Sequence, residues 1–163
     1  VGDYIECDGV RGKVENISYQ STQIEATDGS VMAIPNSSLF AKNFKNLTRK
    51  HSNEFLGLPV GVAYGTDVER TRKVILRALA PLRKPDKFGR PVIDEKYGVQ
   101  VVLGGFGDSS VDLVVKQYVL VDQRVGYTAA ANERIYNALN EAGIQIPFPQ
   151  RDINIRQVPS SEK

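Results

Sequence analysis

The chain has 163 residues, of which 41% are hydrophobic and 25% charged, the composition of a globular protein with one ordinary domain or two small ones. Twenty-one basic and nineteen acidic residues give a formal charge of +2, which is too balanced to indicate nucleic acid as the main partner. A single cysteine excludes an internal disulfide framework, and no apolar run approaches the roughly 20 residues that span a bilayer. These numbers predict a folded core and a reducing compartment, and they do not indicate a function.

The first 48 residues predict short strands separated by turns that contain glycine. The strands are expected over residues 4–7, 12–17, 22–27, 31–34 and 43–48, with a helical turn over 37–41 and a bulge at Gly12. Thr22, Ile24 and Ala26 alternate with polar residues, which predicts one buried and one wet face. Five short curved strands close best into a small Sm-like β barrel, because closure removes free edges.

Residues 28–39 combine a turn, a strand and a stop. Asp28-Gly29 suits a tight hairpin turn, since glycine adopts a positive φ without a steric penalty. Pro35 has no N–H to donate, so strand pairing is expected to end there, and Asn36 is expected to form a local cap or turn. Local chemistry alone predicts an ordinary strand end.

Residues 49–53 are polar and without periodicity, which predicts a boundary between domains at residues 1–50 and 51–163. In the second domain, strands are expected over 54–62, 99–103, 111–121 and 152–156, and helices over 66–80 and 122–142. Thr66 and Glu69 form a capping-box pattern, Pro81 ends the first helix, and Gly143 ends the second. This order of elements predicts a ferredoxin-like βαββαβ domain, so the whole chain is expected to be α+β.

Residue clusters that would carry catalysis are lacking in the sequence. The glycine cluster over 104–107 does not have GxGxxG order and precedes a strand rather than a helix, so phosphate binding is not expected. His51 and Cys7 are the sole residues of their types, which leaves too few ligands for a typical zinc site and no catalytic triad. We therefore expect no enzyme, no metal and no cofactor.

A nucleic-acid-binding face is not indicated either. It would need stacking aromatic side chains interleaved with lysine and arginine along a strand. The strand over 111–121 offers Lys116 and Tyr118 alone. Small barrels and ferredoxin-like sheets nevertheless bind nucleic acid in other proteins. A soluble Sm-like or ferredoxin-like module that binds RNA or protein is for this reason kept as the alternative hypothesis.

Several motifs, taken in order, resemble the small-conductance mechanosensitive channel family. They are Val1-Gly2-Asp3-Tyr4-Ile5, Asp28-Gly29, Ile34-Pro35-Asn36-Ser37-Ser38-Leu39, Gly61-Val62-Ala63-Tyr64, Gly107-Asp108-Ser109-Ser110, Ala142-Gly143-Ile144 and Ile146-Pro147-Phe148-Pro149-Gln150. The resemblance covers nearly the whole chain. It implies the cytoplasmic cage of a homoheptameric channel that opens under membrane tension and releases ions and small solutes on hypo-osmotic shock.

The resemblance also implies where functional residues lie. Pore helices would precede Val1 and anchor the full-length protein in the inner membrane. The residues expected to shape the subunit interface are Gly2, Asp3, Asp28, Gly29, Pro35 and Asn36. Side openings are expected near Arg49, Lys50, His51 and Asn53. Basic groups at those openings would bias which ions enter.

Overall fold

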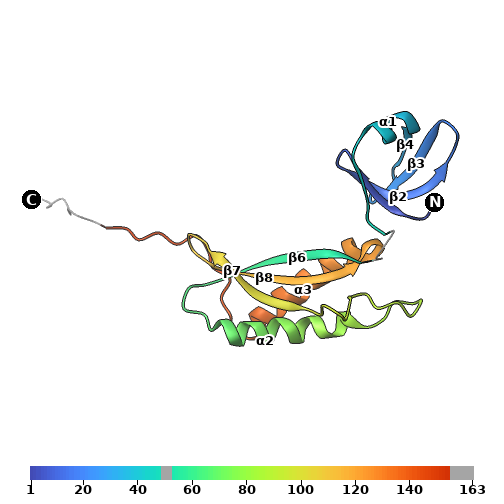
Figure 1. Cartoon of the computed structure of the whole chain (residues 1–163). Coiled ribbons are helices and arrows are strands. Elements are labelled where there is room, and N and C mark those ends of the chain that lie inside the picture. The colour runs from blue at the N-terminus through green and yellow to red at the C-terminus, as the bar shows by residue number, and fades with distance from the viewer. Residues whose placement is uncertain (49–52, 155–163) are drawn as a thin grey trace, which may run out of the picture.

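The computed structural model describes residues 1–48 and 53–154. They form two parts (Figure 1). The first is a sheet with one short helix, and the second is a sheet on which helices pack. We call residues 1–48 the β half and residues 53–154 the α/β half. The α+β class expected from the sequence is confirmed.

The β half is one antiparallel sheet of five strands. Its elements are β1 (Tyr4–Cys7), β2 (Val10–Ile17), β3 (Ser21–Ala26), β4 (Val31–Pro35), α1 (Asn36–Ala41) and β5 (Phe44–Asn46). Ile5, Val14 and Ile24 form its small core. Thr22 and Ile24 are buried while Gln23 and Glu25 are exposed, which confirms the predicted two faces of β3.

Two details of the β half differ from the sequence prediction. The sheet order is β4-β3-β2-β1-β5, and within the described ranges the end strands β4 and β5 do not pair with each other, so the predicted closure into a barrel is not confirmed. The bulge lies between Val14 and Asn16 rather than at Gly12. Gly12 is instead a point of close approach, since a Cβ there would lie 2.2 Å from the carbonyl oxygen of Glu25.

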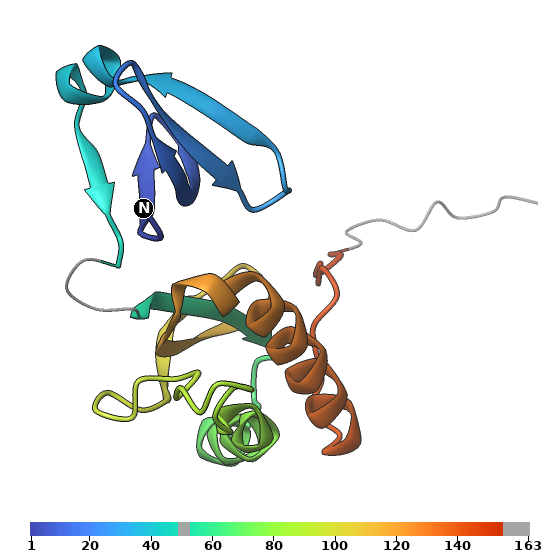
Figure 2. The same cartoon turned by 90° about the vertical axis from the view of Figure 1, so that its right-hand side faces the viewer.

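The α/β half places two helices on one face of a three-stranded antiparallel sheet (Figure 2). Its elements are β6 (Asn53–Val62), α2 (Val68–Leu79), the 3-10 turn η1 (Ala80–Arg83), β7 (Gln100–Phe106), β8 (Val111–Leu120), the 3-10 turn η2 (Val121–Gln123) and α3 (Arg124–Glu141). The sheet order is β6-β8-β7. The predicted order strand, helix, strand, strand, helix is thus confirmed.

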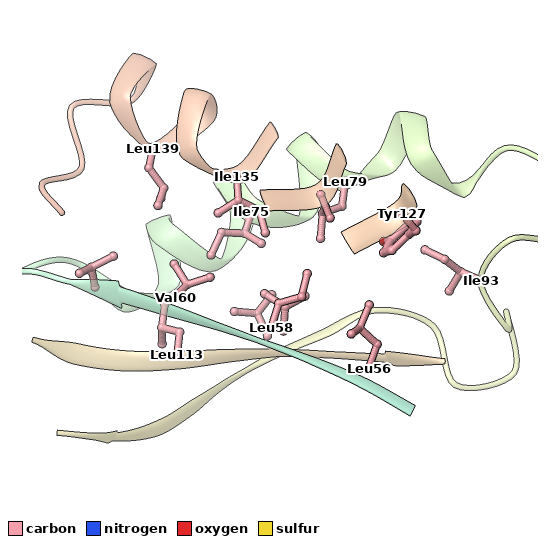
Figure 3. Packing of buried hydrophobic residues seen from close by; sticks show 14 of the residues in the cluster. Leu56, Leu58, Val60, Ile75, Leu79, Ile93, Leu113, Tyr127, Ile135 and Leu139 are labelled. Carbon is pink, nitrogen blue, oxygen red and sulfur yellow. The ribbon is translucent and has the colours of Figure 1, made fainter. Parts of the chain in front are cut away.

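The main core lies between this sheet and its helices (Figure 3). Alternate residues of β6 and β8 point toward α2 and α3, as the period of a strand with one covered face requires. The labelled members of the core are Leu56, Leu58, Val60, Ile75, Leu79, Ile93, Leu113, Tyr127, Ile135 and Leu139. Ile93 lies in the connection between η1 and β7, where it is 1% exposed and bridges to Val119.

The helix ends partly follow the sequence prediction. Asp67, not Thr66, caps α2, because the helix begins at Val68 and the Asp67 carboxylate accepts the N–H of Arg70 at 3.0 Å. Gly143 ends α3 with a φ of +67°, as expected. Residues 152–154 form no strand, and the rest of the predicted last strand, Ile155 and Arg156, lies outside the described residues. In the described ranges no helix combines the length and the apolarity needed to cross a membrane.

The core allows a test with two leucines that face each other across β7 and β8. Leu113 is fully buried, whereas its partner in register, Leu103, is 46% exposed. Leu113→Ala is expected to lower the free energy of unfolding by about 2–5 kcal/mol, because it opens a cavity. Leu103→Ala should cost less than about 1 kcal/mol. Urea unfolding followed by circular dichroism measures both, and equal losses would contradict the assigned core.

Candidate functional site

The N-terminal pair expected at the subunit interface is fastened into the sheet of the β half. The Gly2 N–H donates to the carbonyl oxygen of Val14 at 2.7 Å, with Gly2 at a φ of +86°. The Asp3 carboxylate accepts a hydrogen bond from Asn46 Nδ2 at 2.8 Å. The chain therefore enters the β half along a fixed direction between β2 and β5.

Asp28 and Gly29 form the hairpin turn that the sequence predicts. Asp28 Oδ1 accepts from the N–H of Ser30 at 2.9 Å and from its hydroxyl at 2.6 Å. These hydrogen bonds stabilise the ionised carboxylate, so they lower the pKa of Asp28. Gly29 has a φ of +83°. The turn and the Pro35-Asn36 corner lie at opposite ends of β4, so the structure does not bring these two motifs together.

Asn36 joins three segments of the β half. Its Oδ1 accepts from the Thr22 hydroxyl at 2.8 Å, and its Nδ2 donates to the carbonyl oxygens of Ser18 at 2.9 Å and Tyr19 at 3.1 Å. The expected local cap is wrong: Pro35 is at the N-cap position of α1 and makes no side-chain cap bond. The corner after β4 is thus held to the connection between β2 and β3, a contact that sequence spacing does not reveal.

A cavity of about 470 Å³ lies where the two halves meet. It is lined by Gly2, Asp3, Tyr4, Lys13 and Thr48 from the β half and by Arg90, Val121 and Asp122 from the α/β half. Burial raises the pKa of Tyr4, and the negative charge of Asp122 raises it further. The lining of this cavity contains both acidic and basic side chains.

Glu54, the second residue of β6, connects the halves by charge. Its carboxylate accepts a hydrogen bond from the guanidinium of Arg11 on β2 and lies 3.3 Å from Nε of Arg124 at the start of α3. The Glu54 side chain is only 14% exposed. Arg124 belongs to the same half as Glu54, so the pair between Arg11 and Glu54 is the one of the two that depends on how the halves are placed. Sequence analysis missed this contact, because a glutamate at a strand start carries no signal of its partner.

The expected side-opening residues fall mostly outside the described residues, as Arg49, Lys50 and His51 do. Asn53 begins β6, and its buried Oδ1 has no hydrogen-bond partner in the described part of the chain. It lines a second cavity with Arg90 and Lys96.

The loop before β7 is more ordered than its sequence indicates. Arg90 donates to Asp86 at 2.8 Å and to Asp122 at 2.9 Å, and Gln123 also donates to Asp86. These bonds hold the loop against the start of α3. The composition of this loop does not predict the attachment, because Asp122 and Gln123 lie more than 30 residues from their partners in the loop.

Across residues 1–48 and 53–154, no group of three or more His, Cys, Asp or Glu side chains is placed to hold a metal ion. Cys7 is buried and forms no disulfide bond with another described residue.

Two family descriptions match the chain. The β-domain of the mechanosensitive ion channel matches residues 1–49, and the C-terminal region of the mechanosensitive ion channel MscS matches residues 56–146. The chain therefore belongs to the MscS family of mechanosensitive ion channels, which is a family of channels and not of enzymes.

Individual relatives agree with this assignment. An uncharacterized MscS family protein of Synechocystis sp. is 31% identical over 99% of this chain and 52% of its own length. The small-conductance mechanosensitive channel of Helicobacter pylori is 29% identical over 99% of this chain and 56% of its own. The crystal structure of Helicobacter pylori MscS in its closed state superposes with a TM-score of 0.78 at 28% identity, covering 96% of this chain and 59% of that one. The chain thus spans about half the length of these relatives, whose names give no support to an RNA-binding module.

The Asn36 contacts lead to a first test at this site. Asn36→Ala removes three side-chain hydrogen bonds and leaves the Thr22 hydroxyl without its acceptor. We expect the β half to lose about 1–3 kcal/mol of stability. The neighbouring Ser37→Ala is the control, because Ser37 is exposed and should change stability by less than about 0.5 kcal/mol. Amide hydrogen exchange of β3 and β4 measures the loss, and equal protection in both variants would contradict the fastening role.

The Glu54 contacts lead to a second test. Glu54→Gln keeps the shape but removes the charge that compensates Arg11 of the β half, so the two halves should lose about 1–3 kcal/mol of coupling. Residual dipolar couplings of the two halves should then no longer fit a single alignment. Glu69→Gln is the matched control, since Glu69 pairs with Arg72 within α2. An unchanged common alignment in Glu54→Gln would show that other contacts hold the halves.

Proposed function

We propose that this chain is the cytoplasmic cage of a tension-gated channel that releases ions and small solutes on hypo-osmotic shock. The supporting observation is that both halves, in order, match the two corresponding regions of the MscS family. The matched relatives are about twice as long as this chain. We assign the remaining length of the full protein to membrane-spanning segments in the inner membrane, preceding Val1.

The cage would be a ring of copies of this chain, a homoheptamer. The β half supports this, because its sheet has two different free ends, β4 and β5. Val31 and Met32 on β4 and Phe44 on β5 are exposed apolar side chains next to these edges. When two different surfaces of identical subunits meet, the contact is head-to-tail, and repeated rotation closes it into a ring. Such a contact would also cover the edges that an open sheet leaves unpaired.

Three motifs would shape the edge that each subunit offers. The Asp28-Gly29 turn and the Pro35-Asn36 corner bound the two ends of β4, and the Gly2-Asp3 segment fixes where the chain enters the β half. In this proposal the β half is an Sm-like unit completed by its neighbours, and the α/β half is a ferredoxin-like unit. The side openings would lie beside the junction of the halves, bordered by Arg49, Lys50, His51 and Asn53.

A test on the full-length protein uses the β4 edge. In detergent it should have the native mass of about seven copies, as ring closure requires. Val31→Lys places a charge on the apolar edge and should shift most of the protein to smaller species, since an edge lysine opposes strand pairing. Phe88→Lys, at a position in the loop before β7 that is even more exposed than Val31, should leave the ring intact. A stable monomer of the unmodified protein would overturn the proposal.

A further inference from the structure

On one face of the sheet of the α/β half, no described helix packs against the strands. Leu56, Leu58 and Val60 point toward the helices (Figure 3), so the residues between them point to the opposite face. On that face the strand register places Phe55 beside Tyr118, and Gly57 beside Lys116. On the other side of Lys116 lies Gln100 of β7. The uncovered face therefore has an aromatic row followed by a row with one lysine and one amide.

The aromatic row is extended by a residue from the loop before β7. The rings of Phe55 and Tyr118 are 5.7 Å apart at 69°, and those of Tyr97 and Tyr118 are 4.6 Å apart at 36°. Phe55 is 50% exposed and Tyr97 is 48% exposed. Three joined rings thus leave about half of the surface of the outer two in water. The sequence gives Tyr118 alone on this strand, because Phe55 and Tyr97 come from other segments.

Positive charge and hydrogen-bonding groups lie next to these rings. Lys116 is exposed and forms no ion pair with any described residue. Lys96 has its Nζ 5.3 Å from the centre of the Tyr97 ring. The carboxylate of nearby Asp94 is engaged with the backbone N–H of Lys96 at 2.9 Å. Gly57 has no side chain of its own beside Lys116, and the ring of Phe55 lies next to it, 3.4 Å from the position that a Cβ would take.

These groups surround a hollow of about 290 Å³, lined among others by Phe55, Tyr97, Gln100, Lys116 and Tyr118. This volume is at the small end of ligand sites. Aromatic rings stack on flat heteroaromatic rings, and lysine binds phosphate. We propose that this hollow is a binding site for a free nucleoside monophosphate. Tyr97 and its neighbouring rings would stack on the base, Lys116 would bind the phosphate, and Gln100 would bond to the base or sugar.

A single nucleotide fits these observations better than a nucleic-acid strand. Only one cluster of rings lies on the described part of the open face, whereas strand-binding sheets stack successive bases on separate rings. Farther along the sheet the face carries Gly61 and the carboxylate of Asp112, which opposes a phosphate backbone. This inference does not depend on the proposed channel function.

The experiment is a titration of the 163-residue chain with AMP, followed by amide chemical shifts in NMR. Saturable shifts are expected at Phe55, Tyr97, Gln100, Lys116 and Tyr118. Adenosine should bind more weakly than AMP, and ribose 5-phosphate more weakly still, because stacking supplies most of the affinity. Absence of shifts at these amides at millimolar AMP would overturn the proposal.

Variants separate the two contributions. Tyr97→Ala should weaken AMP binding by about 10-fold or more, the effect of losing one stacking ring. Lys116→Gln, which leaves the aromatic packing unchanged, should weaken AMP binding by about 10-fold and adenosine binding by less than about twofold. The matched controls are Tyr136→Ala and Lys73→Ala, exposed residues on α3 and α2, and both should bind AMP as the unchanged chain does.

Three further outcomes would also overturn the proposal. Equal affinities for ribose 5-phosphate and AMP would mean that the site binds phosphate alone. Unchanged AMP affinity in both Tyr97→Ala and Lys116→Gln would place the binding elsewhere. Hexa-adenylate binding more than about 100-fold tighter than AMP would identify a single-stranded RNA face, since each added stacked base contributes its own affinity.

Discussion

Burial of only one face of the three-stranded sheet is the constraint on which the α/β half depends. Along β6 and β8, every second residue is mostly a buried leucine or valine, and the two helices cover the face that these residues share. The hydrophobic effect fixes this arrangement, because a one-residue shift of register would expose the whole apolar set. The same alternation leaves Phe55, Lys116 and Tyr118 on the opposite face, where no described element covers them. The core and the proposed nucleotide site thus have one cause.

Among residues 1–48 and 53–154, few groups connect the two halves. Their helices and strands pack mainly within each half. The pair of Arg11 and Glu54 bridges the junction, and Arg124 holds Glu54 from within the α/β half. Charge pairs of this kind depend strongly on geometry, whereas apolar packing tolerates small shifts. The relative placement of the halves therefore depends on a few polar contacts, while each half is stabilised by its own core.

The free ends of the sheet in the β half are the surfaces that the proposed ring uses. Isolated strand edges expose unpaired backbone groups, and proteins cover them or block them. Here β4 and β5 end the sheet, next to exposed apolar residues such as Val31 and Phe44. A closed barrel, which the sequence led us to expect, would have no such edges to offer. The open sheet is the feature on which the proposed ring rests.

The sequence by itself determined the α+β class, the order of the elements and most strand positions, because periodicity, Asp28-Gly29 and Gly143 act over a few residues. It also carried the family resemblance. Only the tertiary structure decided the partners of Asn36 and Glu54, the burial of Ile93 and the meeting of Phe55, Tyr97 and Tyr118. Each of these contacts joins residues from separate segments, and local patterns contain no information about which distant segment lies opposite.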